Sequence, residues 1–179
     1  KLVGTPDYGV KGCPPGYYNS CIVVRREDPR RELREYQSAR LARNDIRSQS
    51  GWAALEQELA ERGYGFSFEK NVLDTGGHAA STRAVARGEA DLAAIDAVTW
   101  TLLCRDDRAL TQELRLLETT KPTPGLPLIT SMTEDPSVIF KAVTAAIADL
   151  TPADREVLML KGLTNIAESE YMNGYITPA

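Results

Sequence analysis

Residues 39–63, "ARLARNDIRSQSGWAALEQELAERG", decide the fold, because an apolar run leads through a polar loop into an amphipathic segment. The run 39–45 predicts a short strand. The apolar side chains of the next segment fall on one face of a helix, at spacings of three and four residues: Trp52, Leu55 and Leu59. Ser50 is the predicted N-cap of this helix, and Gly63 stands where a helix is commonly closed. The stretch therefore predicts a strand–loop–helix unit.

The same alternation of strand and helix continues along the chain. Further strands are predicted at residues 21–26, 66–74, 90–96 and 114–120. Further helices are predicted at 78–88 and 97–106, and the pairs Asp135-Pro136 and Thr151-Pro152 each open another. Residues 4–20 are rich in turn formers and predict a loop, 26–38 predict a charged linker with a helical turn, and 121–130 predict an extended crossover. This order is typical of an α/β fold with a largely parallel sheet.

Composition restricts the class of protein. The chain has 179 residues, enough for one core or two small lobes, and a net charge of −4 with a pI near 5.2, which argues against a general nucleic-acid binder. No apolar run approaches membrane-spanning length. His78 is the only histidine, so a site with several histidine ligands is excluded. The cysteines are Cys13, Cys21 and Cys104, and no two of them have C-x-x-C spacing. Cys13 either forms a disulfide, with Cys21 or with a cysteine outside this sequence, or stays a thiol.

Three polar loops each follow a predicted strand and precede a predicted helix. In open α/β sheets, ligands gather at such strand ends. The first loop contains Ser48, Gln49 and Ser50, whose hydroxyl and amide groups stand beside the unpaired backbone N–H groups of a helix start. The residues fit an anion cradle, but the pattern by itself is more typical of an ordinary serine cap.

The other two loops add an imidazole and a carboxylate. Gly76 and Gly77 let the chain turn sharply into a helix that begins at His78, and a histidine there either donates to an anion or lies on the surface. Asp96 caps its own helix, or it also accepts a hydrogen bond from a protonated ligand oxygen, since an ionised carboxylate only accepts. Such an acceptor favours a phosphate-like acid that carries an O–H group over sulfate.

Four stretches occur in the order known from one family: "YYNSCIVVRRED", "RLARNDIRSQSGW", "TGGHAASTRAVARGEADLAAIDAVTW" and "TTKPTPGLPLIT". They cover most of residues 17–130. In these stretches the chain resembles the phosphate-, phosphite- and phosphonate-binding receptors of ABC importers. That family has the type 2 periplasmic binding protein fold. The set Ser-x-Ser-Gly, Gly-His-x-x-Ser and Ile-Asp-Ala in this order carries most of the resemblance.

The resemblance implies two lobes with mainly parallel sheets, joined by hinge crossovers at residues 23–26 and 117–121. The first lobe would comprise residues 1–24 and 119–179, and the second residues 25–118. Members usually have a further N-terminal segment that supplies the first strands of the first lobe, so the resemblance implies that this lobe is incomplete here.

The resemblance also implies a function and a site. The chain would capture a phosphorus oxyanion between its lobes without catalysis and without a cofactor, and would present it to a membrane permease from the periplasm or from an extracytoplasmic lipid anchor. The ligand contacts carried over by motif are Ser48, Gln49, Ser50, His78 and Asp96, with Tyr18 and Ser20 facing them from the other lobe. Gln49 stands where a second hydroxyl residue is common.

Two alternatives remain open at this point. The fold also serves as a ligand-sensing regulatory domain, which would need a fused signalling or DNA-binding segment. Ser81, His78 and Asp96 have the residue types of a hydrolytic triad, but Ser81 follows His78 by three residues on one predicted helix, and no G-x-S-x-G elbow is present.

Overall fold

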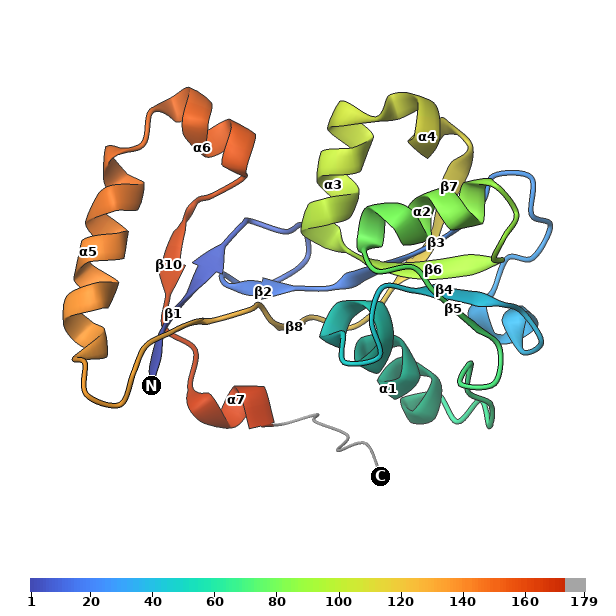
Figure 1. Ribbon diagram of the computed structural model, residues 1–179, viewed down its shortest axis with the longest axis horizontal. Coiled ribbons are helices and arrows are strands. Elements are labelled where there is room, and N and C mark those ends of the chain that lie inside the picture. Colours follow the sequence, from blue (N-terminus) through green and yellow to red (C-terminus); the bar gives the residue numbers. More distant parts are fainter. Residues whose placement is uncertain (173–179) are drawn as a thin grey trace. The chain divides into compact units, whose positions relative to one another are not determined.

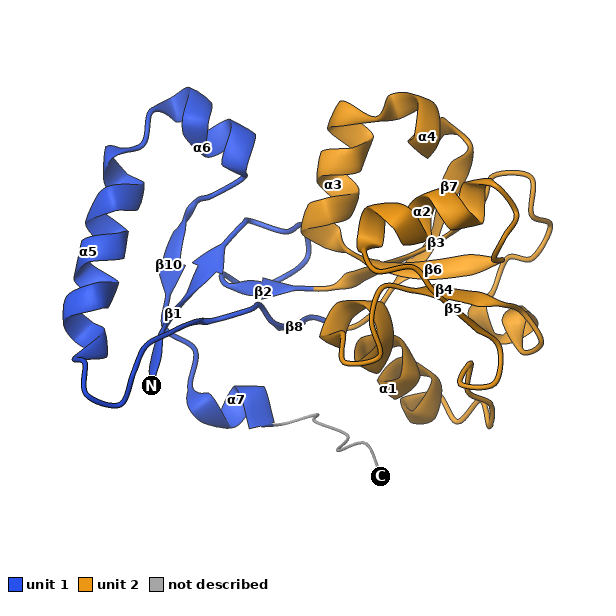
Figure 2. Ribbon diagram, viewed as in Figure 1, with its two compact units in different colours: residues 1–18, 122–175 blue, residues 19–121, 176–179 orange. Residues whose placement is uncertain are grey.

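The computed structural model describes residues 1–172, which form two compact units (Figure 2). Of the described residues, unit 1 comprises 1–18 and 122–172, and unit 2 comprises 19–121. Within the described range, no helix is long and apolar enough to cross a membrane.

Unit 2 is built on a five-stranded sheet in the order β5-β4-β6-β3-β7 (Figure 1). Its strands are β3 (Ser20–Arg25), β4 (Leu41–Arg43), β5 (Val72–Asp74), β6 (Leu92–Asp96) and β7 (Leu114–Thr119). β4 is parallel to β5 and β6, whereas β3 is antiparallel to both β6 and β7. Four strands thus share one direction, as predicted, and β3 runs against them because it enters at the edge where β6 ends, with Ser20 opposite Asp96.

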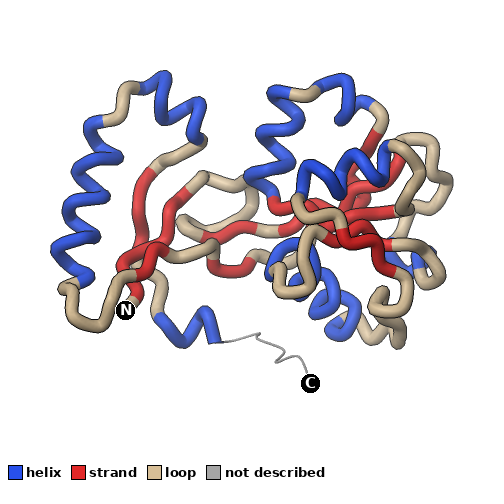
Figure 3. The backbone as a smooth tube through the Cα atoms, in the orientation of Figure 1, coloured by secondary structure: helices blue, strands red, loops and turns tan. Residues whose placement is uncertain are grey.

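Helices flank this sheet on both sides (Figure 3). They are the 3-10 helix η1 (Leu33–Tyr36), the π-helix η2 (Gln49–Ala53) with α1 (Ala54–Glu61) directly after it, α2 (His78–Ala86), α3 (Ala97–Asp106) and α4 (Arg108–Gln112). The predicted helices of this region are confirmed, and only α4 was not predicted. Gly63 has φ +65° just beyond the end of α1, as expected for a residue that closes a helix.

The start of the first predicted helix needs one correction. Its N-cap is Ser48, whose Oγ accepts a hydrogen bond from the N–H of Gly51 at 2.9 Å, and the predicted cap Ser50 lies inside the first turn. The first turn, Gln49–Ala53, is a π-helix, which has more residues per turn than an α-helix. The helix therefore starts earlier in the sequence than predicted, and the regular α-helix begins only at Ala54. π-Turns of this kind are frequent at functional sites.

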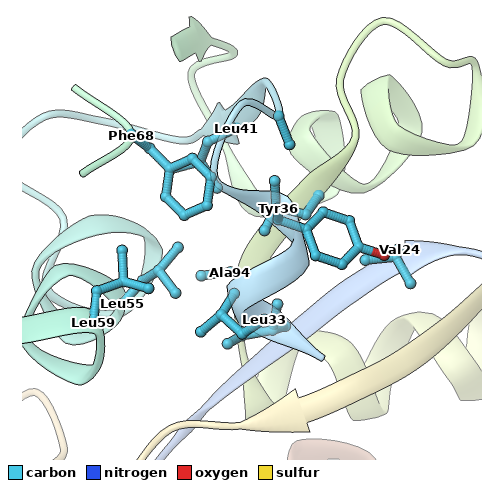
Figure 4. Close-up of a cluster of buried hydrophobic side chains, with 11 residues drawn as sticks. Val24, Leu33, Tyr36, Leu41, Leu55, Leu59, Phe68 and Ala94 are labelled. Atoms are coloured by element: carbon cyan, nitrogen blue, oxygen red, sulfur yellow. The ribbon is translucent and has the colours of Figure 1, made fainter. Parts of the chain in front are cut away.

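In the core of unit 2, apolar side chains of the predicted strands pack against those of the predicted helix α1 (Figure 4). Its buried members come from the sheet, from η1 and α1, and from the loops between them: Ile22, Val24, Leu33, Tyr36, Ala39, Leu41, Leu55, Leu59, Phe68, Leu92 and Ala94. Burying each large aliphatic or aromatic side chain stabilises the fold by about 1.5–3 kcal/mol. The helix face predicted from Leu55 and Leu59 is therefore the face that holds α1 on the sheet, with Trp52 partly buried against the same cluster.

An ion network fixes the charged linker after β3. The Asp28 side chain is 2% exposed and binds the Arg30 guanidinium at 2.6 Å, which also reaches Asp91 at 2.9 Å. Arg30 lies over the ring of Tyr36, 4.0 Å from its centroid. Burial raises the pKa of Asp28, but the hydrogen bonds and charge of Arg30 outweigh burial and hold that pKa at about 2.

Unit 1 contains two small antiparallel sheets. The first has the order β10-β1-β9 and the second pairs β2 with β8. Its elements are β1 (Leu2–Asp7), β2 (Tyr17–Tyr18), β8 (Thr123–Pro124), β9 (Leu128–Ile129), α5 (Pro136–Asp149), α6 (Pro152–Leu158), β10 (Gly162–Thr164) and α7 (Glu168–Met172). Asp135 and Thr151 cap α5 and α6, as predicted from the proline that follows each.

Two expectations for unit 1 are wrong. Residues 4–20 are not all loop, because β1 and β2 lie partly within them, and the sheet pairings are antiparallel rather than parallel. The glycine in β1 serves packing rather than a turn: a Cβ on Gly4 would lie 2.8 Å from the ring of Phe140.

The units divide at residues 18–19 and 121–122, whereas the sequence suggested 24–25 and 118–119. The difference has a simple cause. β3 pairs with both β6 and β7 along its length, so it belongs to the sheet of unit 2.

Candidate functional site

Unit 2 has one edge where the carboxyl ends of three neighbouring strands meet. β4, β5 and β6 are mutually parallel neighbours in the sheet, so the loops that follow them emerge together. These loops are the three singled out in the sequence.

His78, the first residue of α2, is the point on which the loops converge. Its Nε2 lies 3.1 Å from the Oγ of Ser50, which follows β4. It also lies 3.5 Å from the Nδ2 of Asn44 and 3.5 Å from the Oδ2 of Asp96, at the end of β6. The predicted convergence of the imidazole, the hydroxyl and the carboxylate is therefore confirmed.

Asn44 is a member of this group that sequence reasoning missed. Its signal was its place directly after β4, at the head of the polar loop. Its carboxamide lies against Gly51, where a Cβ would fall 1.7 Å from the Asn44 Oδ1. Gly51 is therefore required because only a residue without a side chain leaves room for Asn44 beside the start of the helix.

The loop after β4 is held in place by contacts of Arg43. The Arg43 side chain is 8% exposed and donates to both carboxylate oxygens of Asp74, at 2.8 and 3.1 Å. The same guanidinium lies 4.6 Å from the centroid of the Trp52 ring. Arg43 thus connects the ends of β4 and β5 to the first turn of the helix that carries Ser48, Gln49 and Ser50.

Asp96 performs the capping role predicted for it and keeps a second oxygen at the site. Its Oδ1 accepts from the N–H of Thr99 at 2.8 Å, which caps α3. Its Oδ2 is the atom 3.5 Å from His78 Nε2. One carboxylate oxygen is thereby fixed in place while the other faces the imidazole.

Burial disfavours the charged form of the His78 imidazole. Burial lowers the pKa of His78 from its ordinary value of 6.5, and the charge of Asp96 and the carbonyl of Ala94 oppose this only in part. The side chains of His78 and Asp96 are 15% and 16% exposed. The site therefore presents neutral donors and one carboxylate rather than a cluster of positive charges.

Ser20 belongs to unit 2, not to the opposite lobe as the resemblance implied. Its Oγ donates to the carbonyl of Ser50 at 2.8 Å. Its backbone is bonded to Thr120 in both directions, because Ser20 N donates to Thr120 Oγ1 and Thr120 N donates to Ser20 O, each at 3.0 Å. Ser20 thus links the polar loop to both chain segments that leave the unit.

The remaining predicted contact, Tyr18, lies in unit 1. It is buried there and pairs with Thr123 in the small β2–β8 ribbon.

A buried carboxylate ties α1 to the second segment that leaves unit 2. Glu58 is 5% exposed, accepts from the N–H of Lys121 at 3.1 Å, and pairs with Arg62 at 2.8 Å. The helix that begins at the site is therefore bonded at its far end to the last residue of the unit.

The geometry argues against a hydrolytic triad. Ser81 is fully buried and its Oγ is bonded to the Oγ1 of Thr75 at 2.7 Å. Ser50 cannot replace Ser81 in such a triad. Ser50 and Asp96 face the same nitrogen of His78, whereas a triad uses one ring nitrogen for the serine and the other for the carboxylate.

The described residues contain neither a cluster of metal ligands nor a disulfide. In residues 1–172 no cluster of histidine, cysteine and acidic side chains has the arrangement of a metal site. Cys13, Cys21 and Cys104 form no disulfide with one another.

Comparison with known families gives a match over most of the chain. A family model described as "ABC transporter, phosphonate, periplasmic substrate-binding protein" matches residues 7–173. The chain belongs to this family. No curated protein matches the sequence at a significant level.

Solved structures of low sequence identity share the fold. PhnD1 from Prochlorococcus marinus, solved with methylphosphonate, is 17% identical with a TM-score of 0.75, covering 96% of this chain and 67% of its own. The binding protein PA3383 of an ABC phosphonate transporter from Pseudomonas aeruginosa is 14% identical with a TM-score of 0.72, covering 94% and 57%. XAC2383 from Xanthomonas citri, bound to ATP, is 17% identical with a TM-score of 0.70, covering 96% and 67%. The chain thus spans about two thirds or less of the length of these proteins.

Proposed function

We propose that this protein is the substrate-binding component of an ABC importer and captures a phosphorus oxyanion at the edge of unit 2 formed by Ser50, His78 and Asp96. The family supports the general role, and one observation carries the choice of site. His78 Nε2 stands within 3.5 Å of a hydroxyl, a carboxamide nitrogen and a carboxylate that come from two other strand ends.

Each side chain has a distinct part in this proposal. Ser48, Gln49 and Ser50, together with the N–H groups at the start of the helix, supply donors to the anion. His78 supplies a further donor once it takes up a proton or changes tautomer. Asp96 Oδ2 accepts from an O–H of the ligand. Tyr18 remains a predicted ligand contact from unit 1.

Asp96 gives the site its selectivity. A carboxylate repels an oxyanion that has no proton, but forms a hydrogen bond with one that keeps an O–H group. Methylphosphonate, phosphite and phosphate each have an ionisable O–H, whereas sulfate has none at neutral pH. We therefore expect the three phosphorus oxyanions to bind and sulfate to be rejected.

Calorimetric titration of the protein with methylphosphonate, phosphite, phosphate and sulfate tests this proposal. Asp96→Asn keeps a capping oxygen but removes the negative charge. It should therefore weaken methylphosphonate binding and reduce the difference in affinity between methylphosphonate and sulfate. Asp107→Asn is the matched control, because Asp107 is the N-cap of α4. Absence of heat with every phosphorus oxyanion, or equal effects of both variants, would contradict the proposal.

The protein acts by binding and not by turnover in this proposal. A phosphorus NMR spectrum of methylphosphonate recovered after incubation with the protein should be unchanged. In the cell, the loaded protein would deliver its ligand to a membrane permease from the periplasm. Ligand uptake into liposomes that contain the cognate permease should then require this protein.

A further inference from the structure

A second feature of unit 2 lies at the opposite end of β3 from the candidate site. Here α3, α4 and the beginning of β7 line an open hollow of about 510 Å³. Its lining residues are Arg26, Trp100, Cys104, Arg108, Thr111, Gln112, Leu114, Arg115 and Leu116. β3 runs from Ser20, at the candidate site, to Arg25, so its length separates the two regions.

The hollow concentrates positive charge that is not neutralised locally. Among the described residues, no carboxylate forms an ion pair with Arg26, Arg108 or Arg115. Arg26 and Arg115 donate instead to backbone carbonyls, and the Nε of Arg115 is buried without a partner within residues 1–172.

The acidic side chains close in sequence lie outside the lining. Glu27 lies 4.0 Å from Arg25, and Glu113 is exposed. Asp106 binds Arg105 at 2.7 Å. Asp107 caps α4 and lies 3.6 Å from Arg83. The lining itself therefore holds three arginines and no carboxylate, in a chain whose net charge is −4.

The apolar residues of the hollow indicate what kind of partner fits. Trp100 and Leu114 line it beside the guanidinium groups, and Leu116, on the outermost strand of the sheet, is 45% exposed. Arginine and tryptophan together with exposed apolar side chains are typical of the centre of protein–protein interfaces.

The exposure of the lining argues against a small ligand. Five of its members are exposed: Arg26, Cys104, Arg108, Gln112 and Leu116. Small-molecule sites usually enclose most of the surface of their ligand. A small anion here would stay largely hydrated, whereas a polypeptide segment can cover the whole hollow and pair its carboxylates with the guanidinium groups.

We propose that this hollow docks an acidic segment of a protein partner, with glutamate or aspartate side chains bound to Arg26, Arg108 and Arg115 and an apolar side chain resting on Trp100. The segment binds independently of the oxyanion site. The probe is a fluorescein-labelled six-residue peptide of four glutamates and two leucines, and its binding is followed by fluorescence anisotropy at low ionic strength.

Two double variants with equal change in net charge test the docking site. Arg26→Gln with Arg108→Gln should weaken peptide binding about tenfold, because buried charge pairs with arginine account for much of the binding energy of such interfaces. Arg31→Gln with Arg87→Gln removes two exposed arginines elsewhere on unit 2 and should change it less than twofold. Both double variants should bind methylphosphonate like the unmodified protein.

Four results would overturn the proposal. The first is absence of peptide binding, and the second is equal weakening by both double variants. The third is equally tight binding of a peptide with lysine in place of glutamate, since that would show apolar rather than charge recognition. The fourth is displacement of the peptide by free glutamate or inorganic phosphate at a concentration no higher than the peptide itself needs for binding. That result would assign the hollow to a small anion.

Discussion

The two ends of β3 offer anions two different environments. At the Ser20 end, neutral hydroxyl, amide and imidazole groups are bonded to one another and enclose a single carboxylate. At the Arg25 end, guanidinium groups line an exposed hollow and the adjoining linker is fixed by ion pairs. If the proposed function holds, the comparison teaches that affinity for anions need not come from positive charge, because fixed donors in a partly desolvated site select a ligand by its hydrogen bonds.

The largest effect is expected from the ion network beside the hollow. Asp28→Ala should destabilise unit 2 by about 3 kcal/mol, because it leaves Arg30 without its buried partner. Urea denaturation measures the change. Asp45→Ala, which removes an exposed carboxylate paired with Arg47, should cost less than about 0.5 kcal/mol. Equal losses in both variants would show that the Arg25 end does not depend on its ion pairs.

A smaller and more selective effect is expected at the Ser20 end. Gly51→Ala places a methyl carbon where the Asn44 carboxamide now lies, which should destabilise the protein by about 1–3 kcal/mol and abolish methylphosphonate binding. Gly77→Ala is the matched control in the neighbouring loop, since its Cβ would meet no atom within 4 Å and its φ of −176° suits any residue. Retention of ligand binding by the Gly51 variant would separate this loop from the site.

The smallest effects should appear in the pH dependence of stability, which differs between the two ends. Because the folded pKa of His78 lies below its ordinary 6.5, the unfolded chain takes up the proton first, and stability should fall as the pH drops below about 6.5. Asp28 behaves differently, since its stabilisation is present above pH 3.8 and is lost only as the pH falls toward 2.

Comparing urea midpoints of the protein and of its His78→Gln variant from pH 7.5 to 5 isolates the first of these windows. The midpoint of the unmodified protein should fall relative to that of the variant as the pH falls. A constant difference would show that the imidazole is not held in its neutral form.

The sequence predicted the candidate site better than it predicted the elements around it. The convergence of Ser50, His78 and Asp96 followed from topology alone, because parallel neighbouring strands end at one edge. Which serine caps the helix could not be predicted, since it depends on a π-turn that has no simple sequence pattern. Asn44 was missed for a related reason, because its place depends on the close approach of Gly51.

Other features depend on contacts between distant segments. Arg26 and Arg115 line the same hollow because β3 and β7 pair, and neither side chain stands out in a chain with many arginines. Strand β1 was missed because its glycine and proline are typical of turns, whereas Gly4 in fact makes room for Phe140.

The most direct test of the site uses the fact that His78 is the only histidine, so its NMR signals need no assignment. Methylphosphonate should shift the imidazole resonances saturably, with the same dissociation constant as calorimetry gives, while sulfate leaves them unchanged. Imidazole signals that stay constant while methylphosphonate binds, or that never respond to any phosphorus oxyanion, would contradict the account.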